Sequence, residues 1–380
     1  MNNDEKAQRV LTGSHFQNGN WACFEGAMAA GLTSFYGYPI TPSSEILELA
    51  SIRLKPFGDI FRQMEDEIAS IIACIGASWA GGKAMTATSG PGFSLMQEGV
   101  GLASFTETPL VLVNSQRAGP STGIPTAVAQ GDIMQCAFGS HGDYMNVTIA
   151  PESVQECFDL TVEGFNVSER LRVPVIILLD QSVSSSYERL DIPPAEDIKL
   201  YNRPKTPEEA ISDLVPPMPS FGEGKNVFST GLSHDSKGLP NMDPDIYESL
   251  IKRLFQKVLK HEEILPPPKT ALTEDAEVLF VAIGSVARVV EEAVSYAREK
   301  GEKVGFFRPR TIWPFPYQPF SKVLSRSAIE RIVVIEMNMG QLVYPVKTFA
   351  PPDVEVLSKR VVRARPARLT EILRDIGVKK

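Results

Sequence analysis

The stretch that decides the fold is FYGYPITPSSEILELAS, residues 35–51. A short β-prone run meets Pro39 and Pro42, and a helical pattern follows at once, which predicts a helix over Glu45–Arg53. Proline fixes its own φ angle and restricts the residue before it, so the two prolines make a stiff, bent turn around Thr41. A strand, a rigid loop and a helix in this order predict an α/β unit.

Apolar runs continue to alternate with helical patterns up to about residue 190. The runs PLVLVN (residues 109–114) and VPVIILLD (173–180) are almost continuously apolar, which is typical of parallel strands covered on both faces. In IASIIACI (68–75) the isoleucines recur at helical spacing, and small residues occupy the other faces. That pattern predicts a central helix buried on several sides. The first unit is therefore expected to be a doubly wound parallel sheet.

The pattern changes between residues 190 and 268, where Pro, Asp, Lys and Ser are frequent and one amphipathic helix is expected at Asp243–Lys260. A second α/β unit opens with the buried strand VLFVAI (278–283). The turn after it reads GSVARV and lacks G-x-G-x-x-G, so we interpret it as a tight βα turn and not as a dinucleotide site. We expect three parts, covering residues 1–190, 191–270 and 271–380.

Composition excludes several classes of function. The 380 residues carry a net charge of -8 with a pI of about 5.3, so no nucleic-acid footprint is visible. The N-terminus has no apolar signal core and no apolar run reaches 18 residues, so we expect a cytoplasmic protein without a membrane span. The four cysteines form no C-x-x-C pair and are expected to be buried free thiols. The four histidines lack metal-ligand spacing.

Three loops leave the carboxyl ends of strands in the first unit: residues 39–44, 89–92 and 115–122. All three are rich in Gly, Pro and hydroxyl groups, and ligands of open α/β sheets bind beyond the carboxyl ends of strands. One such loop would be an ordinary turn. Three along one sheet edge predict a binding site.

Two charged residues fall where such a site would use them. Glu67 directly precedes the apolar helix, so its carboxyl can be desolvated, which raises its pKa and favours the neutral, hydrogen-donating form. Glu65 and Asp66 are expected only to match the dipole of that helix. Arg117 leaves an apolar strand and can hold a carboxylate as a fixed fork, the alternative being an ordinary surface arginine. The sequence shows no P-loop and no G-D-G with a downstream Asn.

At this point the sequence resembles a known family. The segments YPITPSSE, QMEDEIASIIACIGASWAG, TSGPG and QRAGPSTGIPT are similar to the α subunit of 2-oxoacid:ferredoxin oxidoreductases, and above all to the 2-oxoglutarate (KorA-like) branch. FRPRTIWPFP and VVIEMNMGQL extend the resemblance over nearly the whole chain. It implies a thiamine diphosphate pyrimidine-binding domain followed by a transketolase C-terminal-like domain.

The resemblance also implies cofactors and partners. The family binds thiamine diphosphate between this subunit and a β subunit, which supplies the Mg2+ and diphosphate motif and a [4Fe-4S] cluster. The absence of G-D-G and of C-x-x-C here is then expected. A γ subunit, and a ferredoxin-like δ subunit, would be separate chains, with coenzyme A as co-substrate and ferredoxin as electron acceptor.

Site residues follow from the matching motif positions. Glu67 matches the catalytic glutamate, which hydrogen-bonds the aminopyrimidine and so promotes removal of the thiazolium C2 proton. Thr41 and Arg117 match residues that hold the carboxylate and carbonyl of the 2-oxoacid, and Thr122 and Thr126 lie where the substrate loop meets the distal end of the substrate. The remaining cofactor contacts implied by the resemblance are Tyr38, Pro39, Ile40, Ser89 and Gly90.

The implied reaction is oxidative decarboxylation of a 2-oxoacid with coenzyme A, giving an acyl-CoA, carbon dioxide and reduced ferredoxin. For 2-oxoglutarate the product is succinyl-CoA. The direction of flux stays open at this point. So do two alternatives: the same chemistry on pyruvate, branched-chain 2-oxoacids or arylpyruvates, and a non-catalytic assembly subunit.

Overall fold

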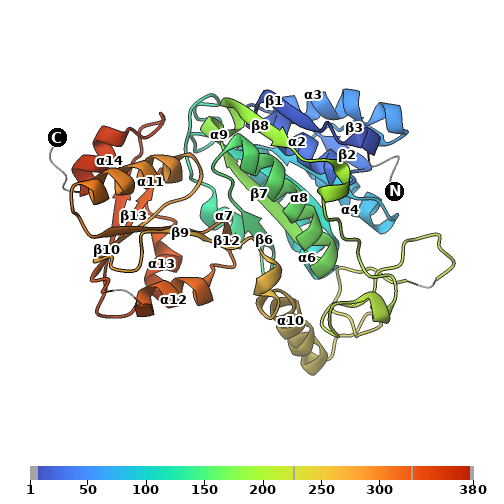
Figure 1. The fold of residues 1–380 in the computed structure, drawn as a ribbon. Helices are drawn as coiled ribbons and strands as arrows, with labels where there is room; N and C mark the ends of the chain where they lie inside the picture. The colour runs from blue at the N-terminus through green and yellow to red at the C-terminus, as the bar shows by residue number, and fades with distance from the viewer. Residues whose placement is uncertain (1–6, 226, 327, 377–380) are drawn as a thin grey trace.

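Two α/β units make up the computed structural model, which describes residues 7–225, 227–326 and 328–376 (Figure 1). The first is built on a seven-stranded sheet of order β12-β6-β7-β5-β4-β2-β3. Every pairing in it is parallel except that of β12 with β6. The strands are β2 (Ser34–Gly37), β3 (Ile60–Gln63), β4 (Ala84–Thr88), β5 (Leu110–Gln116), β6 (Val147–Ile149), β7 (Pro174–Asp180) and β12 (Thr311–Trp313).

Helices cover both faces of this sheet, as its apolar strands require. In β5, Val111 and Val113 pack into one core with helices α2, α3 and α8, while Leu110 and Leu112 pack into another core with α4, α5 and α6. Alternate residues of one strand thus point to opposite layers. The doubly wound architecture expected from the sequence is confirmed. The helices are α2 (Gly19–Ala29), α3 (Ser44–Arg53), α4 (Glu67–Trp79), α5 (Pro91–Leu95), α6 (Gln97–Phe105), α7 (Ile133–Phe138), α8 (Val154–Leu171) and α9 (Gln181–Ser185).

The second unit holds a five-stranded sheet of order β14-β13-β10-β11-β9. The strand predicted at residues 278–283 is present as β10, and the helix after it begins at Gly284. The elements are β9 (Lys269–Ala271), β10 (Val278–Val281), β11 (Val304–Arg308), β13 (Arg331–Glu336), β14 (Glu355–Arg360), α11 (Gly284–Glu299), α12 (Tyr317–Arg326), α13 (Val343–Phe349) and α14 (Leu369–Ile376).

Two pairings join distant parts of the chain. Strand β12 lies within the range predicted for the third part, yet it pairs with β6 at the edge of the first sheet. Strand β1 (Gly13–Asn18) pairs with β8 (Tyr187–Ile192) in a separate two-stranded sheet. The division at residues 190 and 270 stays a prediction, and β12 shows that the two units share a sheet.

The connector carries the predicted amphipathic helix as α10 (Pro244–Leu259). Asp243 caps it by accepting hydrogen bonds from Asp245 and Ile246, and Leu250 and Leu254 are buried. Short 3-10 turns lie elsewhere: η1 (Lys55–Phe57), η2 (Ala195–Asp197), η3 (Pro207–Glu209) and η4 (Glu262–Ile264).

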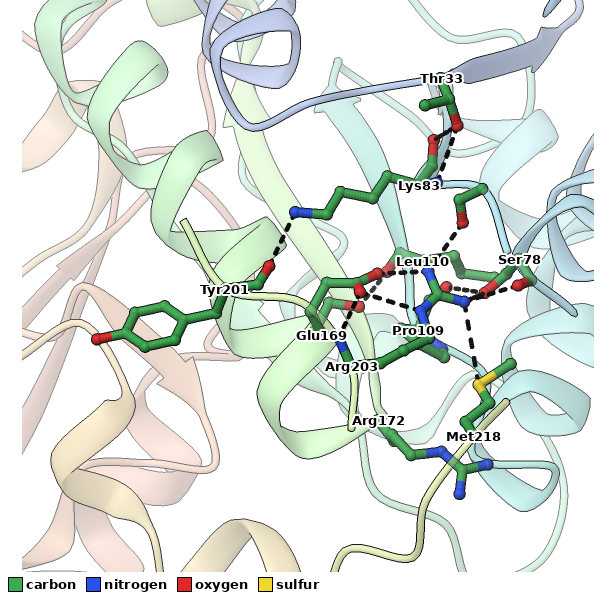
Figure 2. Close-up of polar contacts among 12 residues, drawn as sticks. Thr33, Ser78, Lys83, Pro109, Leu110, Glu169, Arg172, Tyr201, Arg203 and Met218 are labelled. Carbon is green, nitrogen blue, oxygen red and sulfur yellow. Dashed lines mark hydrogen bonds and ion pairs between the residues drawn. The ribbon is translucent and has the colours of Figure 1, made fainter. Parts of the chain in front are cut away.

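A buried ion pair anchors the connector to the first unit (Figure 2). Arg203 lies on the connector and pairs with Glu169 of α8, and both side chains are almost completely buried. The same guanidinium donates to the backbone carbonyl of Ser78 at 2.6 Å and to that of Gly82 at 2.8 Å. A buried charge needs a partner and filled hydrogen-bond positions, and Arg203 has both. This cluster fixes the start of the connector on the first unit.

One expectation for α4 is wrong. The sequence predicted a central helix buried on several sides, but Ile68 is 49% exposed and Ile72 is 41% exposed, whereas Ile71 and Ile75 are buried. Only one face of α4 packs against the sheet, so the chain leaves the opposite apolar face uncovered. The four cysteines are buried and unpaired as predicted, and burial raises their thiol pKa values.

Removing the connector's anchor should destabilise the protein. Arg203→Ala leaves the Glu169 carboxylate buried without its partner, which costs about 3–5 kcal/mol. We expect a clear fall in the urea midpoint of unfolding, followed by circular dichroism. Lys252→Ala, which breaks the exposed pair with Glu248, is the matched control and should change stability by less than about 1 kcal/mol. Equal effects of the two substitutions would contradict the anchoring role.

Candidate functional site

The candidate site lies at the carboxyl edge of the first sheet. Strands β5, β4 and β2 are direct neighbours and run parallel, so their ends at Gln116, Thr88 and Gly37 meet at one edge. The three loops predicted to form a site leave these ends. The structure therefore places them side by side.

Thr41 and Arg117, which the sequence singled out separately, are in contact. The Arg117 guanidinium donates from Nη1 to the backbone carbonyl of Thr41 at 2.6 Å. Arg117 is only 7% exposed, and Thr41 is exposed beside it. The Thr41–Pro42 peptide bond is cis, and Ser43 holds the turn by donating from Oγ to the Ile40 carbonyl at 3.0 Å. A cationic fork and a hydroxyl-bearing residue thus meet at the mouth of the site.

Glu67 is the first residue of α4 and is 5% exposed. Its carboxyl lies against Gly92, at the start of α5, and beside the hydroxyl of Thr88 at the end of β4; a Cβ atom on Gly92 would overlap both groups. Glycine is therefore required for this close approach. The neighbouring Asp66 caps α4 instead, accepting a hydrogen bond from the backbone N–H of Ala69 at 2.8 Å. The structure separates the two acids as the sequence predicted.

Burial decides the protonation of Glu67. Loss of water raises the pKa of its carboxyl above the ordinary value, and the nearby Asp66 charge acts in the same direction, against the lowering effect of the residue's own backbone N–H. Burial also lowers the pKa of Arg117, while Asp132 opposes that shift. A carboxyl with a raised pKa can hold a proton and donate a hydrogen bond at neutral pH.

The other predicted residues lie around Glu67 and Arg117, some buried and some exposed. Ser89 is buried and donates from Oγ to the Ser115 carbonyl at 2.7 Å, and Gly90 packs beside the Arg117 guanidinium. Tyr38 is 40% exposed, next to the exposed Pro39 and the half-buried Ile40 on the loop after β2. Thr122 and Thr126 lie on the exposed part of the loop after β5, and within the described ranges no hydrogen bond joins either to Arg117 or Glu67.

Sequence reasoning missed two features of the site. Thr88 is buried beside Glu67, and its hydroxyl has no hydrogen-bond partner among the described residues; the same is true of Nε of Arg117. Two unpaired polar atoms in one small region mark a place where a ligand can bind. The position of Thr88, as the last residue of β4 and the first residue of TSGPG, was the available signal.

Neither a metal-binding group nor a membrane-spanning helix is found in the described ranges. Within them, no three His, Cys, Asp or Glu side chains gather into a group that could bind a metal ion. None of the helices described there has the length and apolar character that a bilayer crossing requires.

Comparison with known families identifies the fold. Residues 25–252 match the family described as "Pyruvate flavodoxin/ferredoxin oxidoreductase, thiamine diP-bdg", and residues 276–364 match "Pyruvate:ferredoxin oxidoreductase core domain II". The chain belongs to the 2-oxoacid:ferredoxin oxidoreductase family. The expected fold, a thiamine diphosphate-binding domain followed by a second α/β domain, is confirmed.

Individual members of this family are similar over most of the chain. The 2-oxoglutarate synthase subunit KorA of Methanocaldococcus jannaschii is 47% identical over 90% of this chain and 93% of its own length. The ketoisovalerate oxidoreductase subunit VorB of Methanothermobacter thermautotrophicus is 37% identical over 85% of this chain and 86% of its own. The solved 2-oxoglutarate:ferredoxin oxidoreductase of Magnetococcus marinus is 32% identical, with a TM-score of 0.90; it matches 96% of this chain, which spans 65% of that longer one.

The residues of the site fit the pyrimidine end of thiamine diphosphate. A buried carboxyl with a raised pKa suits a ring nitrogen, and the unpaired hydroxyl of Thr88 adds a polar group at the same place. Gly92 has no side chain, which lets both groups approach its backbone closely. The chemistry of these residues thus agrees with the family's cofactor.

The raised pKa of Glu67 predicts how stability changes with pH. The folded protein holds this proton more tightly than the unfolded chain, so the stabilisation it gives is present below about pH 4.3, the ordinary glutamate value, and is lost as pH rises toward the raised pKa. Glu67→Gln cannot ionise. In the cofactor-free subunit we expect the variant to be more resistant to urea than wild type at pH 8 and similar to it near pH 4. Glu65→Gln, at an exposed acid two residues away, should show no such pH-dependent gain.

Proposed function

We propose that this chain is the α subunit of a 2-oxoglutarate:ferredoxin oxidoreductase. It would act with coenzyme A to form succinyl-CoA, carbon dioxide and reduced ferredoxin. The substrate assignment is supported by identities of 43–47% to subunits named KorA, against 36–37% to subunits named VorB. The observation that carries the catalytic role is the buried Glu67 carboxyl, held against Gly92 at the edge where Thr41 and Arg117 meet.

Each residue has a task that its surroundings suit. Bound thiamine diphosphate would supply the carbon nucleophile. Glu67 would hydrogen-bond the ring nitrogen of the aminopyrimidine, because burial raises the pKa of its carboxyl and favours the form that carries a proton. Arg117 would bind the substrate carboxylate through the part of its guanidinium that Thr41 does not engage, and Nε has no partner in the structure. The hydroxyl of Thr41 would lie beside the substrate carbonyl.

Further contacts remain part of the proposal. Tyr38, Pro39 and Ile40 would line one wall of the pyrimidine pocket, and Ser89 and Gly90 another. Thr122 and Thr126, on the loop after β5, would meet the distal end of the substrate.

The uncovered face of α4 is the proposed docking site for a β subunit. Ile68 and Ile72 project from the helix that carries Glu67, and Leu95 of α5 is 46% exposed on the same side of the sheet. Exposed apolar residues grouped beside a functional site are typical of a protein interface. A β subunit bound there would complete the pocket and bring the Mg2+, diphosphate and [4Fe-4S] sites that this chain's described residues do not supply. Separate γ and δ subunits, a ferredoxin acceptor and a cytoplasmic location belong to the same proposal.

One alternative substrate class has its own support. The likeness to VorB, at 37% identity, makes branched-chain 2-oxoacids the second candidate. Pyruvate and arylpyruvates use the same chemistry and belong in the same comparison. A non-catalytic assembly role does not explain why Glu67 is desolvated. Nor does it explain why the buried Nε of Arg117 lacks a hydrogen-bond partner among the described residues.

The complete complex provides the test of function. Co-expressed with its β partner, the chain should support coenzyme A-dependent viologen reduction, with kcat/KM for 2-oxoglutarate at least about tenfold above that for 2-oxoisovalerate, pyruvate or an arylpyruvate. Glu67→Gln should lower kcat by about 100- to 10,000-fold, the usual contribution of a positioned acid–base group, whereas Glu65→Gln should not. Higher efficiency with a branched-chain acid would overturn the substrate assignment, and near-normal turnover by Glu67→Gln would overturn the catalytic one.

The docking face can be tested by adding a charge. Ile72→Lys should weaken association with the β subunit at least about tenfold, since burying an unpaired ammonium at an interface is costly. The isolated subunit should fold normally because Ile72 is already half exposed. Ile52→Lys, at a 68% exposed position on α3 across the sheet, is the matched control. Unchanged co-purification of the Ile72 variant with the β subunit would argue against this face.

A further inference from the structure

The loop that carries Arg117 is closed at its base. Arg117 directly follows β5, and the chain returns at Asp132, whose backbone N–H donates to Oε1 of Gln116 at 3.0 Å. The Asp132 carboxylate accepts a further hydrogen bond from Asn114 of β5 at 3.0 Å. Residues 117–132 therefore form one closed loop, fixed at both ends to a single strand of the first sheet. We call this segment the substrate loop.

Near the end of the substrate loop, the fully buried side chain of Gln130 lies beyond the carboxyl ends of strands in the second sheet. Strands β10 and β13 are parallel neighbours, but β11 follows on one side of the pair and β14 on the other. The order in which strands are added to the sheet thus reverses between β10 and β13. In doubly wound sheets the crevice beyond such a pair is the usual ligand site. Here a side chain of the first unit occupies it.

Gln130 contacts the chain that leaves both strands. Its Nε2 donates to the carbonyl of Ile283, after β10, at 2.9 Å, and its backbone N–H donates to the carbonyl of Met337, after β13, at 3.0 Å. The side chain of Asn338 donates to the Gln130 carbonyl at 2.8 Å. A second link lies next to it, where Gln341 donates to the carbonyl of Gly131 at 2.5 Å.

The first sheet holds the same amide from the other side. Nε2 of Gln130 also donates to Oδ2 of Asp180, the last residue of β7, at 3.0 Å. That carboxylate accepts from the backbone N–H of Ser285 at 2.8 Å, in the first turn of α11. A Cβ atom on Gly284 would lie 2.6 Å from Oδ2 of Asp180 and 2.8 Å from Nε2 of Gln130, so only glycine allows this approach. The turn GSVARV, residues 284–289, therefore packs against Asp180 and Gln130 of the first unit.

We propose that Gln130 is a positioning residue: by filling the ligand crevice of the second sheet, it fixes the substrate loop, and through it Arg117, relative to Thr41 and Glu67. The second unit then contributes to substrate binding without touching the substrate. The proposal rests on the proposed function for its kinetic consequence, but not for its structural one.

The test uses the complete complex with Gln130→Met, which keeps the length of the side chain and removes the hydrogen bonds that the side-chain amide makes. Gln135→Met is the matched control, because Gln135 bonds only the nearby Ser94 through its side chain in the described ranges. We expect Gln130→Met to raise KM for the 2-oxoacid at least about tenfold, with less than a threefold change in kcat. Hydrogen exchange of residues 118–129, read by mass spectrometry, should be at least about tenfold faster than in wild type. Gln135→Met should change neither quantity.

The outcomes separate this inference from the proposed function. General destabilisation would lower the amount of active enzyme and its apparent kcat while KM stays constant, so an unchanged KM in an active complex would overturn the proposal. If the wild-type complex oxidises no 2-oxoacid, the proposed function fails, and hydrogen exchange still decides: unchanged protection of residues 118–129 in Gln130→Met would overturn the positioning role, and faster exchange would support it.

Discussion

The site depends on one constraint, the removal of the Glu67 carboxyl from water. A carboxyl at a helix N-terminus would ordinarily be ionised and exposed, because the helix dipole favours its charge. Here Gly92 lets the backbone of α5 approach so closely that Glu67 is 5% exposed, and the desolvation outweighs the dipole and raises the pKa. Asp66 takes over the capping of α4, which leaves Glu67 free for chemistry. The two neighbouring acids thus differ because Asp66 occupies the N-cap position of α4 and Glu67 is buried.

Much of this arrangement could be predicted from local sequence. Continuous apolar runs located β5, β7 and β10, and an apolar face located α10. The carboxyl-edge loops could be placed together because parallel strands end at the same edge. These features succeed because their causes, apolar periodicity, proline stiffness and capping, act over a few residues. The desolvation of Glu67 followed from its position directly before an apolar helix.

The features that were missed or wrong depend on distant partners. Strand β12 is three residues long and joins the first sheet only because β6 offers an edge, which no local pattern reveals. The helix α4 carries small and apolar residues all round, yet Ile68 and Ile72 are not covered by this chain. The small and apolar residues of α4 show that it can be packed on several sides. They do not show that this chain leaves the side of Ile68 and Ile72 uncovered. Gln130 is a single polar residue in a loop, without periodicity, and its partners Asp180, Ile283 and Asn338 lie 50, 153 and 208 residues away in the sequence.

The two units divide the work in a way that explains why they stay together. The first sheet carries Glu67, Thr41 and Arg117 on its own loops, so the second unit is not needed to supply these groups. Its crevice is filled by Gln130 and its α11 N-terminus by Asp180, so the positions where a doubly wound sheet would bind a ligand are used for internal contacts instead. A ligand bound there would compete with the contacts that hold the substrate loop. The second unit therefore serves as a rigid support for the substrate loop.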